Sequence, residues 1–599
     1  MAQNRIREKI RWFARQDNRI GAVCSIALQL SRGQTEEARE TWALHFSHDG
    51  SRMRISRRER RRQEQTVFSR PVLFSILVPL YNTPIPFLTE MVSSVRGQTY
   101  PKWELCLADG SDEEHGDVRQ YCEEVAAADQ RIRYRKLSEN RGISGNTNAC
   151  FEIAAGEYIV LFDHDDLLHP SALFECMKAI EKQGADYIYT DEVVFASPKV
   201  RKIISTHYKP DWAPDDLLTN NYICHLSVFR KELTEKAGVF RKEYDGSQDY
   251  DLILRLTDCA EKVVHIPKVL YFWRSHPRST ASGISSKGYA VDAGRRAVLD
   301  FLKDKKGIEA AVESVPECPT MYRIHYPIEG NPLVSVIVDC GEEPEQTETW
   351  MEQLCAGTGY VNTEYILVTR DGQEKTDGSF RTIRAAGTRR TERLNRAAET
   401  ARGEYLLFLE EGLIPETADW IEELLMMARQ KEIGAAGGVI VTPERRILQA
   451  GMILGLGPHR TAGRNYFNAS AENSGYHGQM AVMENITAVG AECLMTARDL
   501  FFSGNGFNTD FEDALFDADL CLRYRQKGLR NIYTPYAMMQ SERSIQTRTI
   551  EPGAKKENYG KDAAMFREKW QREIDAGDPY YNPHFSLRYV YIPRRKRKA

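Results

Sequence analysis

The sequence predicts an α/β protein with two tandem Rossmann-like domains, each built on a mostly parallel sheet, and an N-terminal helical extension. From Pro71, short apolar runs alternate with amphipathic segments, as in parallel strands joined by right-handed helical crossovers. The pattern returns after residue 332, and the separation of Asn395 from Gly403 equals that of Asn148 from Gly156. Such a repeat indicates two copies of one fold rather than one large domain.

The composition is that of a soluble globular protein. The 599 residues are 42% hydrophobic and 28% charged, with a formal net charge of −4. The 12 cysteines are scattered without a CxxC pair, so we expect reduced thiols in a cytoplasmic protein and neither a disulfide framework nor a zinc site. The N-terminal residues are charged too often for a signal peptide, and no apolar stretch is long enough for a transmembrane helix.

Changes in composition divide the chain into five parts. We expect a basic helical extension over 1–70, a first α/β domain over 71–313, a linker over 314–332, a second α/β domain over 333–590 and a basic tail over 591–599.

The N-terminal extension carries Arg-rich runs, and Ile6, Ile10, Trp12 and Phe13 fall on one helical face with Arg and Lys opposite. A basic amphipathic helix of this kind binds an anionic membrane surface. A helical hairpin docked on the main body with a solvated basic face explains the pattern as well. Nucleic acid is not favoured as a partner, because the aromatic stacking platforms that accompany such patches are missing.

In the first domain, each predicted strand ends in polar residues together with Gly or Pro. Because the carboxyl ends of parallel strands share one edge, these polar groups converge, as at the nucleotide site of an open α/β sheet. The expected strands are 73–79, 103–108, 132–137, 158–162 and 185–191, with helices over 87–95 and 145–155 and another beginning near 246–252.

The run from Ala155 to Pro170, AGEYIVLFDHDDLLHP, is the centre of this prediction. Residues 158–162 are typical of a strand buried on both faces, yet Asp163, Asp165 and Asp166 follow at once. Burying these carboxylates unpaired would cost on the order of several kcal/mol each, so we expect them at the carboxyl edge of the strand. Closely spaced carboxylates there suit a hard divalent cation that keeps open positions for phosphate oxygens. The alternative is a solvated acidic turn that caps the following helix.

Several stretches share their residues and their order with one enzyme family. They are SILVPLYNTP (75–84), QTYPKWELCLADGSD (98–112), ENRGISGNTNACFEIAAGEYIVLFDHDD (139–166), DGSQDYDLILRL (245–256), HIPKVLYFWRSHPRSTA (265–281), NITAVGAECLMTARDLF (485–501), FDADLCLRYRQKGLRNIYTPYA (516–537) and DPYYNPHFS (578–586). In these stretches the chain resembles glycosyltransferase family 2, the nucleotide-sugar transferases of the GT-A fold. As a tandem protein, it resembles bacterial enzymes that build rhamnose-containing and other cell-surface polysaccharides.

The resemblance implies a nucleotide-diphosphate sugar as donor and a divalent metal ion, Mn²⁺ or Mg²⁺, that neutralises the diphosphate as it leaves. Asp165 is implied as the main metal ligand, with Asp163 and Asp166 beside it. For Asp163 the alternative partners are hydroxyls of the donor ribose or sugar. His276 is implied as a further ligand of the metal or the diphosphate, and its alternative is a structural hydrogen bond.

The resemblance also places the donor nucleoside near Pro79, Tyr81 and Asp109. A carboxylate there accepts the imide hydrogen of uracil or thymine, so a UDP- or dTDP-sugar is expected. Asn140 and Asn148 on the same edge are further expected donor contacts.

Two more side chains have an expected donor role and a structural alternative. Arg141 reaches a phosphate, or it makes a surface salt bridge. Trp273 offers an apolar face to a sugar ring, or it fills the core.

Asp249 is the expected general base. An acceptor hydroxyl is a poor nucleophile until its proton is taken, and a carboxylate within hydrogen-bond reach does this. Direct attack with a single base predicts inversion at the anomeric carbon. Asp251 is expected instead to pair with Arg255 one helical turn later.

The second copy departs from the family at the metal turn. Aligned without gaps from Asn395, the residues that replace Asp163, His164, Asp165 and Asp166 are Glu410, Glu411, Gly412 and Leu413, while the base survives as Asp517. We therefore expect the second copy to be weak or inactive and to bind acceptor glycan or scaffold the first.

The sequence thus predicts a cytoplasmic, metal-dependent, inverting hexosyltransferase that extends a lipid-linked cell-surface glycan at the inner face of the cell membrane. The alternatives are a bifunctional polymerase with two active copies, a non-enzymatic glycan-binding or assembly scaffold, and a metal-dependent hydrolase in which water replaces the acceptor.

Overall fold

The computed structural model describes residues 53–197, 200, 202–276, 288–340, 344–369, 374–377, 380–385, 389–542, 553–588 and 590–593. The contacts divide these residues into two compact units. The first takes in the described residues up to Lys209, Ile223–Ala293 and those from Asn582 onward, and the second takes in Pro210–Tyr222 and Gly294–Tyr581. The expected domain limits at 71–313 and 333–590 stay a prediction, because a compact unit need not be a piece that folds alone.

The first unit alternates strands and helices from β1 onward, as the apolar runs predict. Its elements are α4 (Arg57–Glu64), β1 (Phe74–Leu80), α5 (Ile85–Arg96), β2 (Trp103–Asp109), α6 (Gly116–Ala128), β3 (Ile132–Lys136), α7 (Gly142–Ile153), β4 (Tyr158–Leu161), β5 (Leu167–Leu168), α8 (Ala172–Gln183), β6 (Tyr187–Ala196), β7 (Ile203–His207), β8 (Ser227–Arg230), α10 (Leu233–Ala237), α11 (Gln248–Cys259), β9 (Val263–Ser275) and the start of α12 (Gly288–Lys306).

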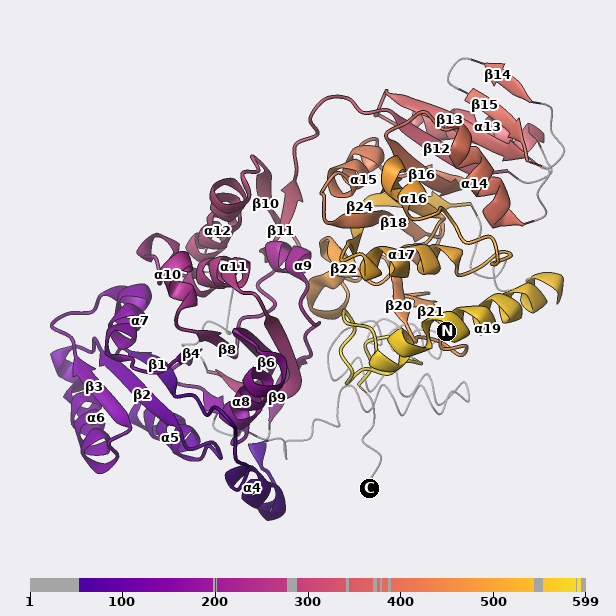
Figure 1. Ribbon diagram of the computed structural model, residues 1–599. Helices are drawn as coiled ribbons and strands as arrows, with labels where there is room; N and C mark the ends of the chain where they lie inside the picture. Colours follow the sequence, from indigo (N-terminus) through magenta and orange to yellow (C-terminus); the bar gives the residue numbers. More distant parts are fainter. Residues whose placement is uncertain are drawn as a thin grey trace, which may run out of the picture. The chain divides into compact units, whose positions relative to one another are not determined.

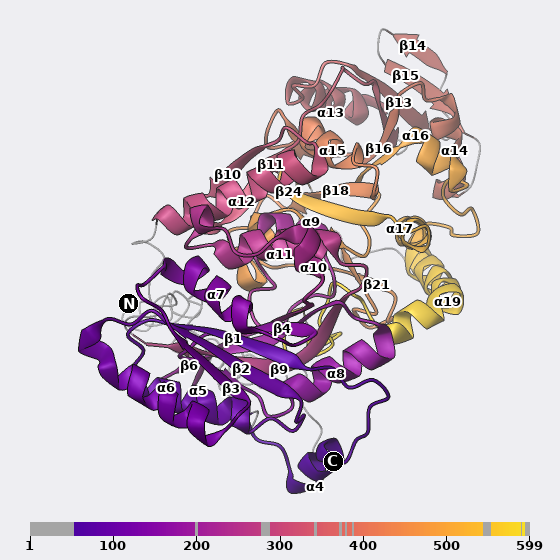
Figure 2. The same ribbon diagram turned by 60° about the vertical axis from the view of Figure 1, so that its left-hand side comes forward.

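The sheet of the first unit has nine strands in the order β3-β2-β1-β4-β8-β6-β9-β5, with β7 paired to β6. Strands β1 to β4 pair in parallel and β8 runs antiparallel between β4 and β6, so the sheet is mixed. Leu80 lies opposite Asp109, and Leu77 lies opposite Leu161, so the carboxyl ends of β1, β2 and β4 meet at one edge. Helices α5 and α6 cover one face of these strands, and α7 covers the other (Figures 1 and 2). The α/β class is confirmed.

The second unit repeats this arrangement. Its elements are α9 (Pro214–Thr219), β10 (Ala311–Val315), β11 (Cys318–His325), β12 (Val334–Asp339), α13 (Pro344–Ala356), β13 (Thr363–Thr369), β14 (Lys375–Asp377), β15 (Phe380–Arg384), α14 (Arg390–Thr400), β16 (Tyr405–Glu410), β17 (Leu413–Pro415), α15 (Trp420–Ala428), β18 (Ile433–Val441), β19 (Ile447–Gln449), β20 (Met452–Leu454), β21 (Ala462–Arg464), β22 (Glu484–Ile486), β23 (Cys493–Ala497), α16 (Arg498–Ser503), α17 (Phe516–Gln526), β24 (Arg530–Ser541) and α19 (Gly553–Ala576).

The two sheets share one strand order. The run β13-β12-β16-β23-β18-β24-β17 of the eleven-stranded second sheet has the order of β2-β1-β4-β8-β6-β9-β5 in the first. The directions agree as well, since β12 pairs in parallel with β13 and β16, whereas β23 runs antiparallel to β16 and β18. The predicted tandem repeat is therefore confirmed at the level of topology.

A glycine begins the central strand of each copy for a steric reason. A Cβ on Gly156 would lie 2.6 Å from the carbonyl oxygen of Leu73 and 2.6 Å from Oγ of Ser75. A Cβ on Gly403 would lie 2.5 Å from Oγ of Ser335. These separations are shorter than van der Waals contact, so the backbone can approach only where the side chain is missing.

Within the described residues, the predicted N-terminal extension includes α4. Thr99 donates to the side chain of Gln63 at 2.7 Å, and Arg60 donates to the carbonyl of Gly97 at 3.1 Å, so α4 is docked on the body. Arg57 and Arg61 stay exposed. The predicted amphipathic face at Ile6–Phe13 lies outside the described residues.

Two further expectations concern the whole chain. The cysteines within the described ranges are free thiols, as their scattered spacing predicts. None of the helices in the described parts combines the length and the apolar character needed to cross a membrane.

Candidate active site

The acidic turn that follows β4 meets the loop that precedes β8. The two strands are antiparallel, with Leu161 opposite Ser227, so the end of one faces the beginning of the other. The loop supplies His225, whose Nε2 lies 3.6 Å from Oδ2 of Asp163. One ligand atom from each of Asp163, Asp166 and His225 lies within 4.8 Å of the other two, which is close enough for all three to hold one metal ion.

Asp166 is the fully buried member of this group. Its carboxylate accepts hydrogen bonds from the hydroxyl of Tyr271 and the backbone N–H of Arg274, each at 2.6 Å. Burial, followed by the neighbouring carboxylates of Asp165 and Asp163, raises the pKa of Asp166 well above its ordinary value. A divalent cation offsets both effects, and carboxylate oxygens with an imidazole nitrogen are donors that Mn²⁺ accepts, so these residues fit the implied metal.

The surroundings of His225 also favour positive charge at this site. Burial acts against protonation, but contacts with Cys224, Asp163 and Glu192 raise the pKa of His225 well above its ordinary value. The ring stacks on Tyr271, with centroids 4.4 Å apart. These contacts thus favour positive charge beside Asp163, and a bound cation would supply it in place of the imidazole proton.

Asp165 and His276 form a separate pair. Oδ2 of Asp165 lies 3.0 Å from Nε2 of His276, and both side chains are mostly buried. Arg274 donates to the backbone carbonyl of Asp165 and forms an ion pair with Glu90 at 2.6 Å, which fixes the turn. The predicted ligands are thus divided between Asp163 and Asp166, which face His225, and Asp165, which faces His276.

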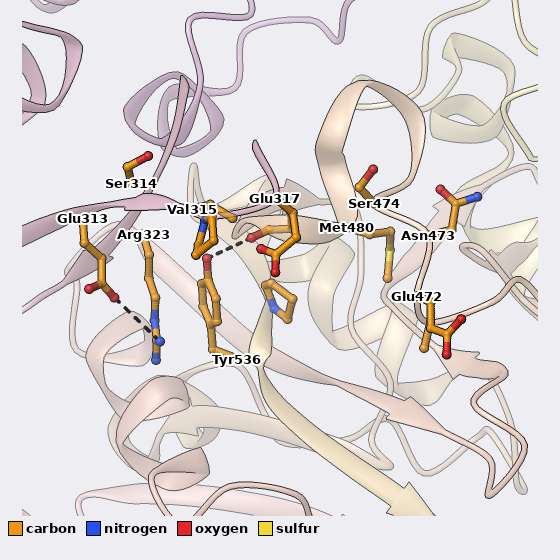
Figure 3. Close-up of a pocket in the computed structure, with 14 residues that line it drawn as sticks. Glu313, Ser314, Val315, Glu317, Arg323, Glu472, Asn473, Ser474, Met480 and Tyr536 are labelled. Atoms are coloured by element: carbon orange, nitrogen blue, oxygen red, sulfur yellow. Dashed lines mark hydrogen bonds and ion pairs between the residues drawn. The ribbon is translucent and has the colours of Figure 1, made fainter. Parts of the chain in front are cut away.

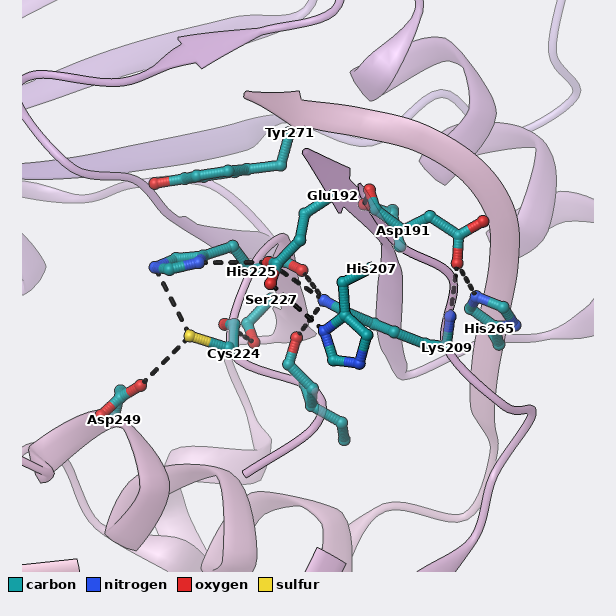
Figure 4. Close-up of polar contacts among 12 residues, drawn as sticks. Asp191, Glu192, His207, Lys209, Cys224, His225, Ser227, Asp249, His265 and Tyr271 are labelled. Atoms are coloured by element: carbon teal, nitrogen blue, oxygen red, sulfur yellow. Dashed lines mark hydrogen bonds and ion pairs between the residues drawn. The ribbon is translucent and has the colours of Figure 1, made fainter. Parts of the chain in front are cut away.

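The expected base Asp249 lies at the same site. It is in the first turn of α11, and Sγ of Cys224 lies 4.0 Å from its Oδ2 and 3.6 Å from Nε2 of His225 (Figure 4). Cys224 therefore connects the base to the candidate metal ligands. Asp251 has the expected structural partner, because Arg255 contacts its Oδ2 at 2.5 Å.

The expected nucleoside residues gather at the ends of β1 and β2. Pro79 is buried in β1, and the ring of Tyr81 is 48% exposed beyond its end. Asp109 ends β2 with no exposed surface, and its carboxylate accepts from the N–H of Ser111 at 2.8 Å and the hydroxyl of Tyr134 at 2.9 Å. Tyr81 thus offers the accessible surface, and Asp109 fixes the strand edge beneath it.

Asn140 and Asn148 are held by other parts of the fold. Oδ1 of Asn140 accepts from Nδ2 of Asn146 at 3.0 Å and so shapes the loop before α7. Asn148 donates to the carbonyl of Phe240 at 2.9 Å and accepts from its N–H at 3.1 Å. This geometry favours a structural role for Asn148 over the predicted donor contact.

Arg141 and Trp273 differ in their surroundings. Arg141 is exposed at the N-terminal end of α7. The half-buried ring of Trp273 packs against the core and lies 5.1 Å from the ring of His225. Trp273 therefore borders the candidate metal site.

Sequence reasoning missed His225 and the buried groups behind it. Nδ1 of His225 lies 3.2 Å from Oε2 of Glu192, and Glu192 forms an ion pair with Lys209 at 3.2 Å. No acidic run or regular spacing marks these residues. The only sequence signal is the position of His225 two residues before the strand that pairs with β4, and this signal appears only once the pairing is known.

The second copy has different residues in the corresponding place. Phe408 lies opposite Leu494 in β16 and β23, as Leu161 lies opposite Ser227 in β4 and β8. Leu494 therefore corresponds to Ser227, and the residue two positions before Leu494, Glu492, corresponds to His225. The candidate metal group of the first copy therefore becomes two glutamates and an apolar leucine, at Glu410, Glu492 and Leu413.

Arginines balance these acids in the second copy. Arg464 forms an ion pair with Glu492, and Arg393 contacts both oxygens of Asp339 at 2.8 and 2.5 Å. Asp517 accepts from the N–H of Ala491 at 2.9 Å. Burial, followed by repulsion from Glu492, raises the pKa of Asp517 to about 6.

The second unit also contains an open cavity of about 610 Å³. Tyr536 lies in its wall, with the guanidinium of Arg323 4.0 Å from the ring centroid, and the hydroxyl of Tyr536 donates to the carbonyl of Ala481 at 2.8 Å (Figure 3). Glu317 and Asn473 are exposed along the rim. The lining thus combines an aromatic ring with carboxylate and amide groups.

Comparison with known proteins identifies the first copy. Residues 75–238 match the family model described as glycosyl transferase family 2. An uncharacterized protein of Sinorhizobium fredii, y4gI, is 36% identical over 537 residues, which are 86% of this chain and 58% of that protein. The O-antigen biosynthesis protein RfbC of Myxococcus xanthus is 30% identical over 534 residues, which are 87% of this chain and 41% of that protein.

The chain thus spans about half the length of these relatives. Among solved structures, residues 1–349 of S. aureus TarS resemble it with a TM-score of 0.32 and 17% identity over 38% of this chain and 65% of that one. The matched residues 75–238 contain β1 to β8, the acidic turn and His225. Residues 75–238 of the chain therefore form a domain of glycosyltransferase family 2.

Proposed function

We propose that the first copy is a metal-dependent, inverting glycosyltransferase that moves a sugar from a UDP- or dTDP-sugar to a lipid-linked cell-surface glycan. The observation that carries this proposal is the connected group Asp163, His225, Cys224 and Asp249, in which each side chain lies within 4.0 Å of the next. Candidate cation ligands and a candidate base therefore occupy one site, as the reaction requires.

Asp163, Asp166 and His225 would hold the cation, which would act as a Lewis acid on the leaving diphosphate. The carboxylate of Asp166 is fixed by Tyr271 and Arg274, so its position is set before the donor arrives. Preorganised ligands reduce the cost of binding a charged donor.

Asp249 would take the proton of the acceptor hydroxyl. Its place in the first turn of α11 brings the positive end of the helix dipole near its carboxylate, which favours the ionised form that a base needs. Attack by the activated hydroxyl on the side opposite the diphosphate inverts the anomeric carbon.

The proposal on the acceptor and the cellular site rests on two supports. The Myxococcus xanthus relative is described as an O-antigen biosynthesis protein, which makes a surface glycan the proposed acceptor. The exposed arginines of α4 give the described part of the extension a basic face, in keeping with a cytoplasmic protein at the inner face of the membrane.

Transfer assays with UDP-, dTDP- and GDP-sugars, after a thermal-shift screen for the donor, test this function. We expect transfer to stop in EDTA and to return with Mn²⁺ or Mg²⁺. Undiminished transfer in EDTA would contradict the metal requirement. Donor binding without turnover would instead support a scaffold, and equal sugar release with and without acceptor would support a hydrolase.

We propose that the second copy does not catalyse transfer. Its crevice places Glu410, Glu492 and Asp517 where the first copy has candidate ligands and a base. Arg464 forms an ion pair with Glu492, and, against the effect of burial, the charges of all three acids raise the pKa of Arg464. The arginine charge in this crevice is already engaged by carboxylates, so it would not neutralise an entering diphosphate as a bound divalent cation would. A bifunctional polymerase would be supported if loss of Asp517 removed one of two linkages from the product.

We propose that the cavity of the second unit holds acceptor glycan. The ring of Tyr536 offers an apolar surface for a sugar face, and the exposed carboxylate of Glu317 and amide of Asn473 can bond hydroxyl pairs. Replacement of Asn473 by Ala is expected to raise the KM for acceptor and to leave the KM for donor unchanged. An unchanged KM for acceptor would count against this site.

A further inference from the structure

The last described residues of the chain contribute to the first copy rather than the second. The DPYYNPHFS motif is divided between the units, because Tyr581 ends the second unit and Asn582 returns to the first. Asn582 and Phe585 are 3% and 1% exposed, so these two side chains anchor the segment from Asn582 to Phe585 in the first unit. We call it the C-terminal segment.

Asn582 makes the central contacts of the C-terminal segment. Its Nδ2 donates to the carboxylate of Asp191 at 3.1 and 3.3 Å and to the carbonyl of Lys209 at 2.8 Å. Asp191 is fully buried, and it also accepts from the N–H of Lys209 at 2.9 Å. Asn582 and Asp191 therefore hold the backbone of Lys209 from both its carbonyl and its N–H.

Lys209 in turn supports the loop that presents His225. Its fully buried Nζ forms an ion pair with Glu192 at 3.2 Å and donates to the carbonyls of Ile223, at 2.5 Å, and of His225 (Figure 4). Glu192 contacts Nδ1 of His225 at 3.2 Å. Lys209 thus fixes both the backbone of His225 and the carboxylate that orients its ring.

The second copy offers an independent comparison. Tyr189 lies opposite Ser227 in the first sheet, and Gly437 lies opposite Leu494 in the second, so these positions correspond. Two and three positions after Tyr189 lie Asp191 and Glu192, and two and three positions after Gly437 lie Val439 and Ile440. Both of these apolar residues are fully buried. The polar support is therefore present in the copy that keeps the acidic turn and is lost in the copy without it.

We propose that the C-terminal segment is a positioning element of the first copy and that Asn582 acts through Asp191, Lys209 and Glu192 to orient His225 for the cation. The proposal rests on the proposed metal-dependent function. Groups that orient a metal ligand typically change metal affinity or activity about 10–100-fold when they are removed. Residues 582–585 would thereby support a site whose other residues lie more than 300 positions earlier in the sequence.

The chain offers a matched control within the same segment. Nε2 of His584 contacts the carbonyl of Pro267 at 2.9 Å, and its ring stacks on Tyr208 with centroids 4.9 Å apart. These contacts dock the C-terminal segment without touching Asp191 or Lys209. His584→Ala therefore removes docking contacts, whereas Asn582→Ala removes the connection to His225.

The test compares Asn582→Ala and His584→Ala in the full chain. Mn²⁺ affinity is measured from the electron paramagnetic resonance signal of free Mn²⁺, and the imidazole ¹⁵N shifts of His225 are measured without metal and assigned with His225→Gln. We expect Asn582→Ala to raise the Kd for Mn²⁺ about tenfold and to move the His225 shifts. His584→Ala is expected to leave both within about twofold of wild type.

Equal effects of the two replacements would show that docking alone matters and would overturn the proposal, as would wild-type behaviour of Asn582→Ala. If Asn582→Ala does not fold, Asn582→Ser replaces it in the test, because serine keeps a hydroxyl donor. Its Kd for Mn²⁺ is expected to lie between the wild-type value and an about tenfold higher one. A wild-type Kd for Asn582→Ser would overturn the proposal. Failure of the wild-type chain to bind Mn²⁺ would instead refute the proposed metal-dependent function. The two failures are therefore distinguishable.

Discussion

The two copies keep the same buried hydrogen bonds and differ in the residues placed to do chemistry. A serine in the first strand of each copy donates to a glutamate of the second strand and accepts from the N–H of a glycine: Ser75, Glu104 and Gly156 in one copy, and Ser335, Glu364 and Gly403 in the other. An Asp–Arg pair on a helix is also repeated, with each arginine donating to two backbone carbonyls: Asp251 and Arg255, and Asp519 and Arg523.

These repeated contacts show which residues the fold requires. The strand ends of both copies are held by the same polar groups, although one copy has a candidate cation site and the other has Glu492 paired with Arg464. Stability and chemistry therefore depend on separate residues, and the chemical residues can change while the sheet stays the same. Replacing corresponding residues in the two copies tests this separation.

The largest expected effect compares the two aspartates that begin the corresponding helices. Asp249→Asn is expected to lower kcat about 10²–10⁴-fold, because the amide cannot take the acceptor proton. Asp517→Asn is expected to leave kcat unchanged, since the second copy is proposed to be inactive. Transfer rates at saturating donor measure both, and a comparable loss from Asp517→Asn would remove the proposed difference between the copies.

The next effect concerns which histidine binds the cation. His225→Ala is expected to raise the Kd for Mn²⁺ about a hundredfold, the upper end of what is lost when a group that orients a ligand is removed. His276→Ala is expected to raise it less than about tenfold, because the structure pairs His276 with Asp165 away from the group of three. Calorimetric titration with Mn²⁺ distinguishes them. A larger rise in Kd from His276→Ala than from His225→Ala would indicate that the metal binds at Asp165 and His276 instead.

A smaller effect follows from the buried Asp517. Burial, followed by Glu492, raises the pKa of Asp517 to about 6, whereas the unfolded value is about 3.9. The folded state thus binds more protons between these values, and the free energy of unfolding falls as the pH rises from about 4 to about 6.

Asp517→Asn removes the free-energy cost of ionising this buried carboxyl group. The variant is expected to be more stable than the wild type by about 1–3 kcal/mol near pH 7 and equally stable near pH 4. Urea unfolding at both pH values measures the difference. A difference independent of pH would mean that Asp517 does not titrate in this range.

The sequence predicted the strands at the start of the first copy and the edge at which their polar residues meet. Apolar runs that end in Gly, Pro and Asp mark strands and their carboxyl ends, and parallel pairing then brings Pro79, Asp109 and Asp163 to one edge. His225 was beyond this reasoning, because it depends on the antiparallel pairing of β8 with β4, which places a loop distant in sequence beside the turn.

The function of some predicted residues was also beyond sequence reasoning. A motif residue that contacts a ligand and one that holds the fold have the same sequence pattern. Asn148 illustrates this, because its counterpart Asn395 is retained in the copy that has lost the three aspartates of the turn. The structure shows that both amides bond the backbone of a phenylalanine, Phe240 in one copy and Phe507 in the other.

The smallest expected effect uses this last pair. Asn148→Ala and Asn395→Ala each remove a donor bond and an acceptor bond to the facing phenylalanine, of 2.9 and 3.1 Å in the first copy and 2.8 and 2.9 Å in the second. Each replacement is therefore expected to lower the free energy of unfolding by about 1–2 kcal/mol. Urea unfolding measures this loss, and the KM for donor, taken well below the unfolding midpoint, is expected to stay within about twofold of wild type for both. A rise in the KM for donor from Asn148→Ala, without a rise from Asn395→Ala, would show that Asn148 contacts the donor as well as Phe240. The two asparagines would then have different functions in the two copies.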